Sequence, residues 1–266
     1  GIGWLDAPVS GGELGARVVH WPPTLTEAPM TDTTAAPTVW GEIDGRTITF
    51  PMEVTDFDAA TLMFSVPADA AQALLPGDAF EVLAVDGLAQ FVLALCDYHE
   101  NPWGDYLEMN LGLLARPAGA GDEVMGSFVY RMPVDQAFTC RAGNEVMGFP
   151  KTVEDLSVER SDGRVSFAWH IDGELVVSVS FPDVAGTGDV ASVETGSYSY
   201  LHGVPHETPL AMDMGTGLLD PADVVITLGS GPVADELRTL GLPKPPDFGT
   251  WGTGLSATFQ LGHPLG

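Results

Sequence analysis

Lys151 is the residue of this sequence best suited to carry out chemistry. It is one of only two lysines, the other being Lys244, and it ends the segment GNEVMGFPK at residues 143–151. A lysine held against apolar neighbours loses solvation of its charged form, so we expect its pKa to fall and its neutral amine to be accessible near pH 7. Schiff-base chemistry on a carbonyl substrate requires such an amine. The alternative is a surface lysine that follows a proline-bounded turn.

Glu108 lies in a stretch with the period of a β-strand. Apolar residues at 107, 109, 111 and 113 alternate with Tyr106, Glu108, Asn110 and Gly112, so one face of the strand is apolar and the other polar. In a sandwich the polar face meets water. In a barrel it can line an internal pocket, with Glu108 pointing inward. The pattern leaves both alternatives open.

The segment that ends at Lys151 resembles the acetoacetate decarboxylase family, in which a Gly-x-Glu segment is followed by aromatic-Pro-Lys. Here these positions are Gly143, Glu145 and Phe149-Pro150-Lys151. The similarity covers about residues 45 to 260 and is most specific between 98 and 155. It implies an imine at Lys151 and favours Glu108 in the pocket, as the acid/base for protons on the carbinolamine and enamine.

The resemblance also implies residues that support Lys151. Glu145 would hold the lysine loop through hydrogen bonds, with a solvated helix-end carboxylate as the alternative. Phe149 and Tyr106 are candidates for substrate binding or support. Arg141 is a candidate for a cation brought close to Lys151 by the fold.

Two positions depart from the family pattern. Thr152 stands where the decarboxylase has a second lysine, which helps to depress the pKa of the nucleophile, and Phe57 stands where the family has an arginine for the substrate carboxylate. Activation of Lys151 must then come from desolvation or from an arginine such as Arg141 or Arg131. Imine formation is therefore better supported than decarboxylation of acetoacetate.

Three functions agree with these residues. The first is a cofactor-independent lyase that decarboxylates acetoacetate or a related β-keto acid through a Schiff base at Lys151. The second is a Schiff-base aldolase or dehydratase acting on a larger keto acid. The third is a non-catalytic barrel that binds a small molecule and holds an unactivated lysine.

Composition narrows the setting. The 37 acidic and 10 basic residues give a formal charge of −27, which would repel nucleic acid and anionic membranes. Cys96 and Cys140 are too few for a disulfide framework and indicate buried thiols in a reducing compartment. No signal peptide or membrane-length apolar run is visible. We expect a cytoplasmic protein, and the resemblance adds a small keto-acid partner and a homo-oligomer.

The pattern along the chain predicts a mainly β fold, an antiparallel barrel or closed sandwich with two or three short helices. Hairpins are expected where Asp-Gly pairs lie at residues 86–87, 162–163 and 172–173. The expected strands are 47–54, 61–66, 80–85, 88–98, 106–113, 124–133, 154–159, 165–171, 175–181, 192–201, 224–228 and 255–260.

Helices are predicted at 68–75 after Pro67, at 135–146 with Asp135 as the N-cap, and at 233–240. Residues 1–40 are rich in proline and threonine, so we expect a disordered extension before a single domain at 41–266.

Other motifs are weak. His202 and His206 have an i, i+4 spacing, but Gly203 and Pro205 argue against the helix that would align them for a metal, so two loop histidines are expected. Gly229-Ser230-Gly231 is expected to be a turn rather than an anion cradle. Nothing in the sequence indicates a metal or an organic cofactor.

Overall fold

The computed structural model describes residues 36–266. Most of the expected N-terminal extension lies outside these residues, but the expected boundary at residue 41 falls within a strand, β1 (Thr38–Ile43). This strand pairs with β2 (Arg46–Phe50) around the Asp44-Gly45 turn. Among the described helices, none has the length and apolar character needed to cross a membrane.

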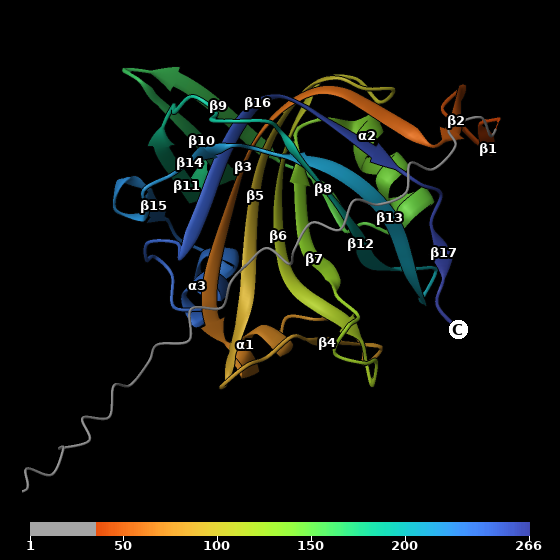
Figure 1. Cartoon of the computed structure of the whole chain (residues 1–266), viewed down its shortest axis with the longest axis horizontal. Coiled ribbons are helices and arrows are strands. Elements are labelled where there is room, and N and C mark those ends of the chain that lie inside the picture. The colour runs from red at the N-terminus through yellow and green to blue at the C-terminus, as the bar shows by residue number, and fades with distance from the viewer. Residues whose placement is uncertain (1–35) are drawn as a thin grey trace, which may run out of the picture. The chain divides into compact units, whose positions relative to one another are not determined.

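Seven long strands close into a barrel, which confirms the predicted fold class (Figure 1). The order around the barrel is β16-β3-β5-β6-β7-β12-β13, and β13 pairs with β16 to complete it. One neighbour pair, β7 with β12, is parallel. The long connection between these two strands leaves room for the crossover that a parallel pair needs. The strands are β3 (Met52–Pro67), β5 (Leu88–Glu100), β6 (Tyr106–Pro117), β7 (Gly126–Val134), β12 (Ala191–Leu201), β13 (Val204–Met214) and β16 (Phe248–Phe259).

A second sheet has four strands, three of which lie between β7 and β12 in the chain and the fourth after β13. It contains β9 (Asp155–Ser161), β10 (Arg164–Ile171), β11 (Glu174–Pro182) and β15 (Val225–Leu228). Asp162-Gly163 and Asp172-Gly173 turn the chain between its strands with positive φ at both positions, as two-residue hairpin turns require. Both predicted hairpins are confirmed.

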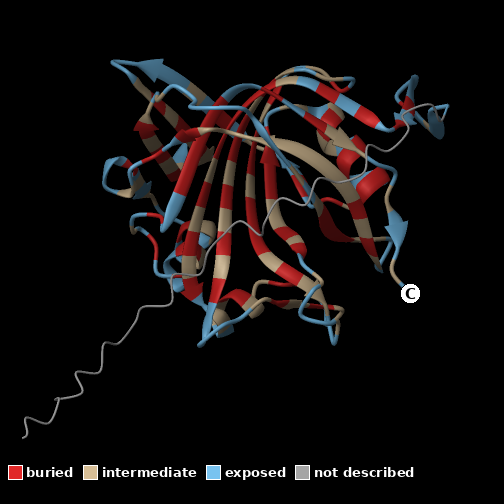
Figure 2. Ribbon diagram, in the orientation of Figure 1, coloured by how far each residue is buried: buried red, intermediate tan, exposed pale blue. Residues whose placement is uncertain are grey.

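The barrel strands are buried on both faces, and buried positions recur along them in Figure 2. One face, with Phe64, Phe91 and Leu111, packs against the small sheet and the helices α1 (Ala68–Gln72) and α3 (Pro232–Thr239). The other face, with Cys96 and Tyr106, packs against α2 (Ala137–Ala142), the π-helical turn η1 (Gly143–Met147) and the β1–β2 hairpin. We call the second cluster the α2-side core.

A hairpin prediction and a loop prediction are wrong. The 80–85 segment does not form a hairpin with 88–98, because β4 (Phe80–Val82) pairs with β6 and only Val85 bridges to Leu88 across the Asp86-Gly87 turn. The residues around His206 are not a loop: His202-Gly203 is the turn between β12 and β13, and His206 is buried in β13 opposite Ser199. Pro205 is compatible with this strand because it lies near the hairpin end, where it is paired with Tyr200.

The two helices predicted before residue 150 are shorter than expected. The first ends at Gln72. The second starts after Gln136, whose side chain accepts from the backbone N–H of Thr139, so Gln136 and not Asp135 is the N-cap. Asp135 instead accepts from the backbone N–H of Leu107. The helix then widens into η1 and ends at Gly148, as predicted.

The shorter strands β8 (Lys151–Val153), β14 (Gly217–Leu218) and β17 (His263–Pro264) and the 3-10 turn η2 (Pro221–Asp223) complete the described elements. Of these, β8 matters most for the site, because it adds to β7 in parallel and starts at Lys151.

Replacement of Gly148 by alanine should destabilise the fold through two separate effects. Gly148 has φ of +69°, and a Cβ there would lie 2.3 Å from the carbonyl oxygen of Tyr200. Gly163 has φ of +73° with nothing within 4 Å of an added Cβ, so Gly163→Ala carries the conformational cost alone. We expect Gly163→Ala to lower the free energy of unfolding by about 1 kcal/mol and Gly148→Ala by clearly more. Urea unfolding of both variants measures this, and equal losses would contradict the close contact at Gly148.

Candidate active site

Lys151 is buried at the junction of η1 and β8. Its side chain is 3% exposed, and its Nζ lies 2.9 Å from Glu108 Oε2 and donates to Thr139 Oγ1 at 2.8 Å. Lys151 pairs with Met132 of β7, while Thr139 lies in the first turn of α2. The fold therefore brings together a strand residue, a helix residue and a lysine that are separated in sequence.

Glu108 points from β6 into the α2-side core. Its Oε2 forms an ion pair with Lys151 Nζ, and its Oε1 accepts a hydrogen bond from Asn110 Nδ2 at 3.0 Å. Glu108 is 5% exposed, so the polar face of this strand does not meet water. The alternative in which this face meets water is therefore excluded.

Aromatic and thiol side chains surround the pair. The Lys151 Nζ lies 5.0 Å from the ring centroid of Tyr106 and 5.5 Å from that of Trp103. Burial, reinforced by nearby groups including Glu108, raises the pKa of Tyr98, Tyr106 and Cys96 well above their usual ranges. These three neighbours are therefore neutral, and the negative charge that Lys151 meets is that of Glu108.

The proposed supporting residues fall into two groups. Phe149 is buried in the α2-side core with Tyr106. Glu145 and Arg141 instead form an exposed pair, with Arg141 Nε donating to Glu145 Oε1 at 2.8 Å, and Arg141 also bonds Asp44 at the β1–β2 turn. This second group ties the hairpin to η1.

Neither arginine considered for activating Lys151 stands beside it. Arg131 makes a two-pronged bond to Glu236 of α3, at 2.7 and 2.9 Å, and Arg141 is engaged with Glu145 and Asp44. The alternative of an arginine neighbour is therefore not realised by these two residues. Thr152, next to Lys151, is exposed, and Phe57 is buried against Tyr98.

Sequence reasoning did not identify Thr139 or Trp103 as neighbours of Lys151. Thr139 could have been suspected because it is the polar residue on the buried side of a short helix that leads into the lysine segment. Trp103 lies in a loop with no periodic pattern, so nothing local connects it to Lys151.

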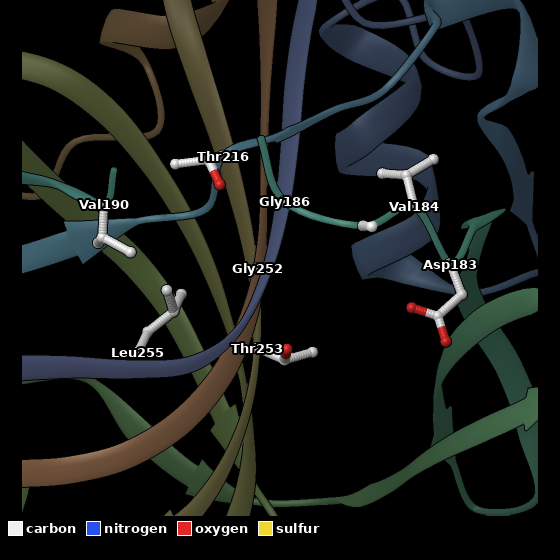
Figure 3. Close-up of a pocket in the computed structure, with 9 residues that line it drawn as sticks. Asp183, Val184, Gly186, Val190, Thr216, Gly252, Thr253 and Leu255 are labelled. Atoms are coloured by element: carbon white, nitrogen blue, oxygen red, sulfur yellow. The ribbon is translucent and has the colours of Figure 1, made fainter. Parts of the chain in front are cut away.

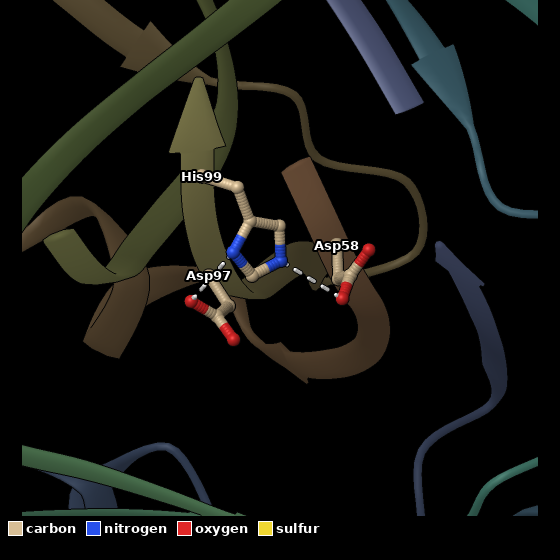
Figure 4. Close-up of side chains that lie close together, drawn as sticks. All are labelled: Asp58, Asp97 and His99. Atoms are coloured by element: carbon tan, nitrogen blue, oxygen red, sulfur yellow. Dashed lines mark hydrogen bonds and ion pairs between the residues drawn. The ribbon is translucent and has the colours of Figure 1, made fainter. Parts of the chain in front are cut away.

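A second polar cluster contains Asp58 of β3 with Asp97 and His99 of β5 (Figure 4). His99 Nε2 lies 3.1 Å from Asp58 Oδ2 and its Nδ1 lies 3.7 Å from Asp97 Oδ1. These groups are of metal-ligand type, and their ligand atoms lie within 4.8 Å of one another. Arg160 already pairs with Asp58, however, and Asp58 Oδ1 accepts from the backbone N–H of Gly254. Arg160 thus supplies the positive charge, and the cluster ties β9 and β16 to β3 and β5.

A cavity of about 320 Å³ opens at another place on the barrel (Figure 3). It is lined by residues 183–186, Val190, Thr216, Gly252, Thr253 and Leu255, and neither Lys151 nor Glu108 contributes to it. Asp183 at its rim accepts from Trp251 Nε1. The chemistry-bearing groups and this cavity are therefore separate features.

Comparison with known proteins finds a matching family and solved structures of similar fold. The family model described as acetoacetate decarboxylase matches residues 34–209. The structure of acetoacetate decarboxylase from Legionella pneumophila subsp. pneumophila str. Philadelphia 1 superposes with a TM-score of 0.60 at 16% identity, over 81% of this chain and 87% of that one. A search of curated proteins finds no match.

The enduracididine biosynthesis enzyme MppR is also similar in fold. Its complex with pyruvate superposes with a TM-score of 0.57 at 18% identity, over 87% of this chain and 99% of that one. Its complex with the condensation product of pyruvate and imidazole 4-carboxaldehyde has a TM-score of 0.50 at 17% identity, over 88% and 98%. At these identities the superpositions show a shared fold.

Neutralising Glu108 should destabilise the protein strongly. Glu108→Gln leaves the buried Lys151 ammonium without a counter-charge, for which about 3–5 kcal/mol of unfolding free energy is typical. Glu145→Gln is the matched control, because it breaks an exposed pair with Arg141 and should change the stability little. Chemical denaturation measures the free energy of unfolding of both variants. Similar losses in the two would show that the buried pair contributes no more to stability than the exposed pair.

The His99 cluster should make stability depend on pH. Burial lowers the pKa of His99, but the hydrogen bond to Asp58 and the nearby carboxylates outweigh it, so the pKa of His99 is raised. A raised pKa gives stabilisation that is complete below the unfolded value of about 6.5 and is lost as pH rises through the folded value. The stability difference between wild type and His99→Gln should therefore shrink from pH 6 upward. Urea midpoints at a series of pH values test this, and a constant difference would contradict it.

Proposed function

Since the chain belongs to the acetoacetate decarboxylase family, we propose that it is a cofactor-independent enzyme that forms a Schiff base between Lys151 and a small keto acid. The observation that carries the proposal is the buried contact of Lys151 Nζ with Glu108 Oε2 at 2.9 Å. A surface lysine would have neither this partner nor this burial. The pairing provides a nucleophile and a proton acceptor in direct contact, which imine formation requires.

The first step proposed is transfer of a proton from Lys151 Nζ to Glu108. The neutral amine then attacks the substrate carbonyl carbon, and a proton passes from the attacking nitrogen to the carbonyl oxygen, giving a neutral carbinolamine. Glu108 protonates the departing hydroxyl, water leaves, and a protonated imine forms. The Thr139 hydroxyl, which accepts from Nζ at 2.8 Å, helps to aim the nitrogen lone pair as the proton departs.

The second step uses the protonated imine as an electron sink. In a β-keto acid, the bond between the α-carbon and the carboxylate breaks, its electron pair flows toward nitrogen, and carbon dioxide leaves an enamine. Glu108 then takes up a proton from solvent and delivers it to the enamine carbon, and hydrolysis of the resulting imine releases the ketone and frees Lys151. The buried aromatic rings of Trp103 and Tyr106 keep water away from the imine while this bond breaks.

An aldolase or dehydratase is the second candidate. The same imine can break or form a carbon–carbon bond to an aldehyde, and MppR is known with a condensation product of pyruvate and an aldehyde. Thr152 in place of a second lysine, together with the engagement of Arg131 and Arg141 elsewhere, also favours chemistry that differs from that of the decarboxylase proper.

Borohydride trapping tests the imine directly. The full-length protein is incubated with acetoacetate or with pyruvate, reduced and digested, and the adducts are located by mass spectrometry. We expect the adduct on Lys151, its loss in Lys151→Ala, and its retention in Lys244→Arg, since the chain has two lysines. Glu108→Gln should slow trapping by about 10²–10⁴-fold, because the proton acceptor is removed.

The fate of the substrate separates the two candidates. Release of carbon dioxide from acetoacetate supports the decarboxylase, and cleavage or dehydration of longer keto acids supports the aldolase or dehydratase. If Lys151 takes no label from acetoacetate, pyruvate or larger 2-keto acids, both proposals fail and a binding barrel is left.

A further inference from the structure

The side chain of Asn144 contacts the main chain of Lys151 on both sides. Asn144 Oδ1 accepts from the Lys151 N–H at 2.9 Å, and Asn144 Nδ2 donates to the Lys151 carbonyl oxygen at 3.2 Å. The Cys140 thiol donates to the same carbonyl at 3.3 Å. Lys151 is the first residue of β8, which has β7 as its strand partner. The amide of Asn144 thus bonds Lys151 as a second neighbouring strand would.

The π-helical geometry of η1 places Asn144 there. The turn from Gly143 to Met147 is wider than an α-helical turn, and it is closed by the bonds of Gly148 N–H to Asn144 O at 3.2 Å and of Phe149 N–H to Gly143 O at 3.1 Å. Single π-turns in α-helices recur at functional sites because they redirect side chains. Here the turn returns the chain so that residue 151 comes back to residue 144.

The lysine side chain then passes over Gly143. A Cβ on Gly143 would lie 2.7 Å from Lys151 Cδ and 2.8 Å from its Cε, so the alkyl chain occupies the space that glycine leaves. Its Nζ reaches Glu108 and Thr139 at the end of a long flexible stem. A small displacement of the Lys151 backbone is therefore carried to Nζ, and the two bonds of Asn144 oppose it.

We propose that Asn144 is a positioning residue, which holds the backbone of Lys151 so that Nζ stays in contact with Glu108. The expected effect of Asn144 on the reaction rate rests on the proposed Schiff-base function, whereas its effect on the position of Lys151 does not. Asn144 is an exposed residue, so its truncation opens no cavity in the core. Its effect on the site can therefore be separated from a general loss of folding.

The test uses protein grown with ¹³C-labelled lysine, which places probes at two residues, Lys151 and Lys244. The rings of Trp103 and Tyr106 lie near the Lys151 Nζ and shift its neighbouring ε-methylene signal, whereas Lys244 bonds the Ser65 carbonyl and serves as the internal reference. In Asn144→Ala the Lys151 signal should move toward the position of free lysine, and the Lys244 signal should not move. Thr152→Ala, at an exposed position next to Lys151, is the control and should leave both signals in place.

The second readout is the rate of borohydride trapping at saturating pyruvate. We expect a fall of about tenfold or more in Asn144→Ala, with little change in the half-saturating concentration, because misplacement affects attack more than binding. Asn144→Asp keeps the acceptor for the Lys151 N–H and loses the donor, so its trapping rate should lie between those of wild type and Asn144→Ala. This variant also tests the proposal if the alanine variant fails to fold.

An unmoved Lys151 signal and a trapping rate equal to that of Thr152→Ala would overturn the inference. If wild-type protein forms no imine with any keto acid, the proposed function fails. The lysine signals still decide whether Asn144 positions Lys151 in that case.

Discussion

The buried ion pair of Lys151 and Glu108 is the constraint on which the rest of the site depends. Removing two opposite charges from water costs several kcal/mol for each ion, and the cost is offset only where the geometry is good and the remaining polar groups are bonded. Here Glu108 Oε1 is bonded by Asn110, and Lys151 Nζ also donates to Thr139. The pair is therefore held by further partners from a strand, β6, and a helix, α2, so it depends on the packing of β6, β8 and α2 against one another.

The two-sided burial of the barrel strands explains how a polar face can be kept inside. The small sheet, α1 and α3 cover one face, and α2, η1 and the β1–β2 hairpin cover the other. A strand in such an arrangement needs no solvent face, so Glu108 and Asn110 can stand among Tyr106, Cys96 and Phe149. Because the tyrosines and the thiol are neutral, the charges in this region are those of the ion pair.

The pattern of the strands was largely predictable because hairpin turns and alternation are local. The Asp-Gly pairs at 162–163 and 172–173 specify their turns by positive φ, and the small sheet follows. The pairing of β4 with β6 was not predictable, since the turn at Asp86-Gly87 suits a hairpin equally well and distant contacts decide the partner. The start of α2 at Gln136 was missed because Asp135 is an equally good cap in isolation and is used by Leu107 instead.

For the site, the sequence by itself indicated Lys151 as the nucleophile candidate through its residue type and its segment, and it indicated Glu108 as the acid/base candidate through the resemblance to the family. Only the tertiary structure decided that both faces of β6 are buried, that Thr139 and Trp103 reach Lys151, and that Arg131 and Arg141 are engaged with Glu236, Glu145 and Asp44. The physical reason is that these contacts join segments distant in the chain. Their distances depend on how these segments pack against one another, and no local pattern encodes that packing.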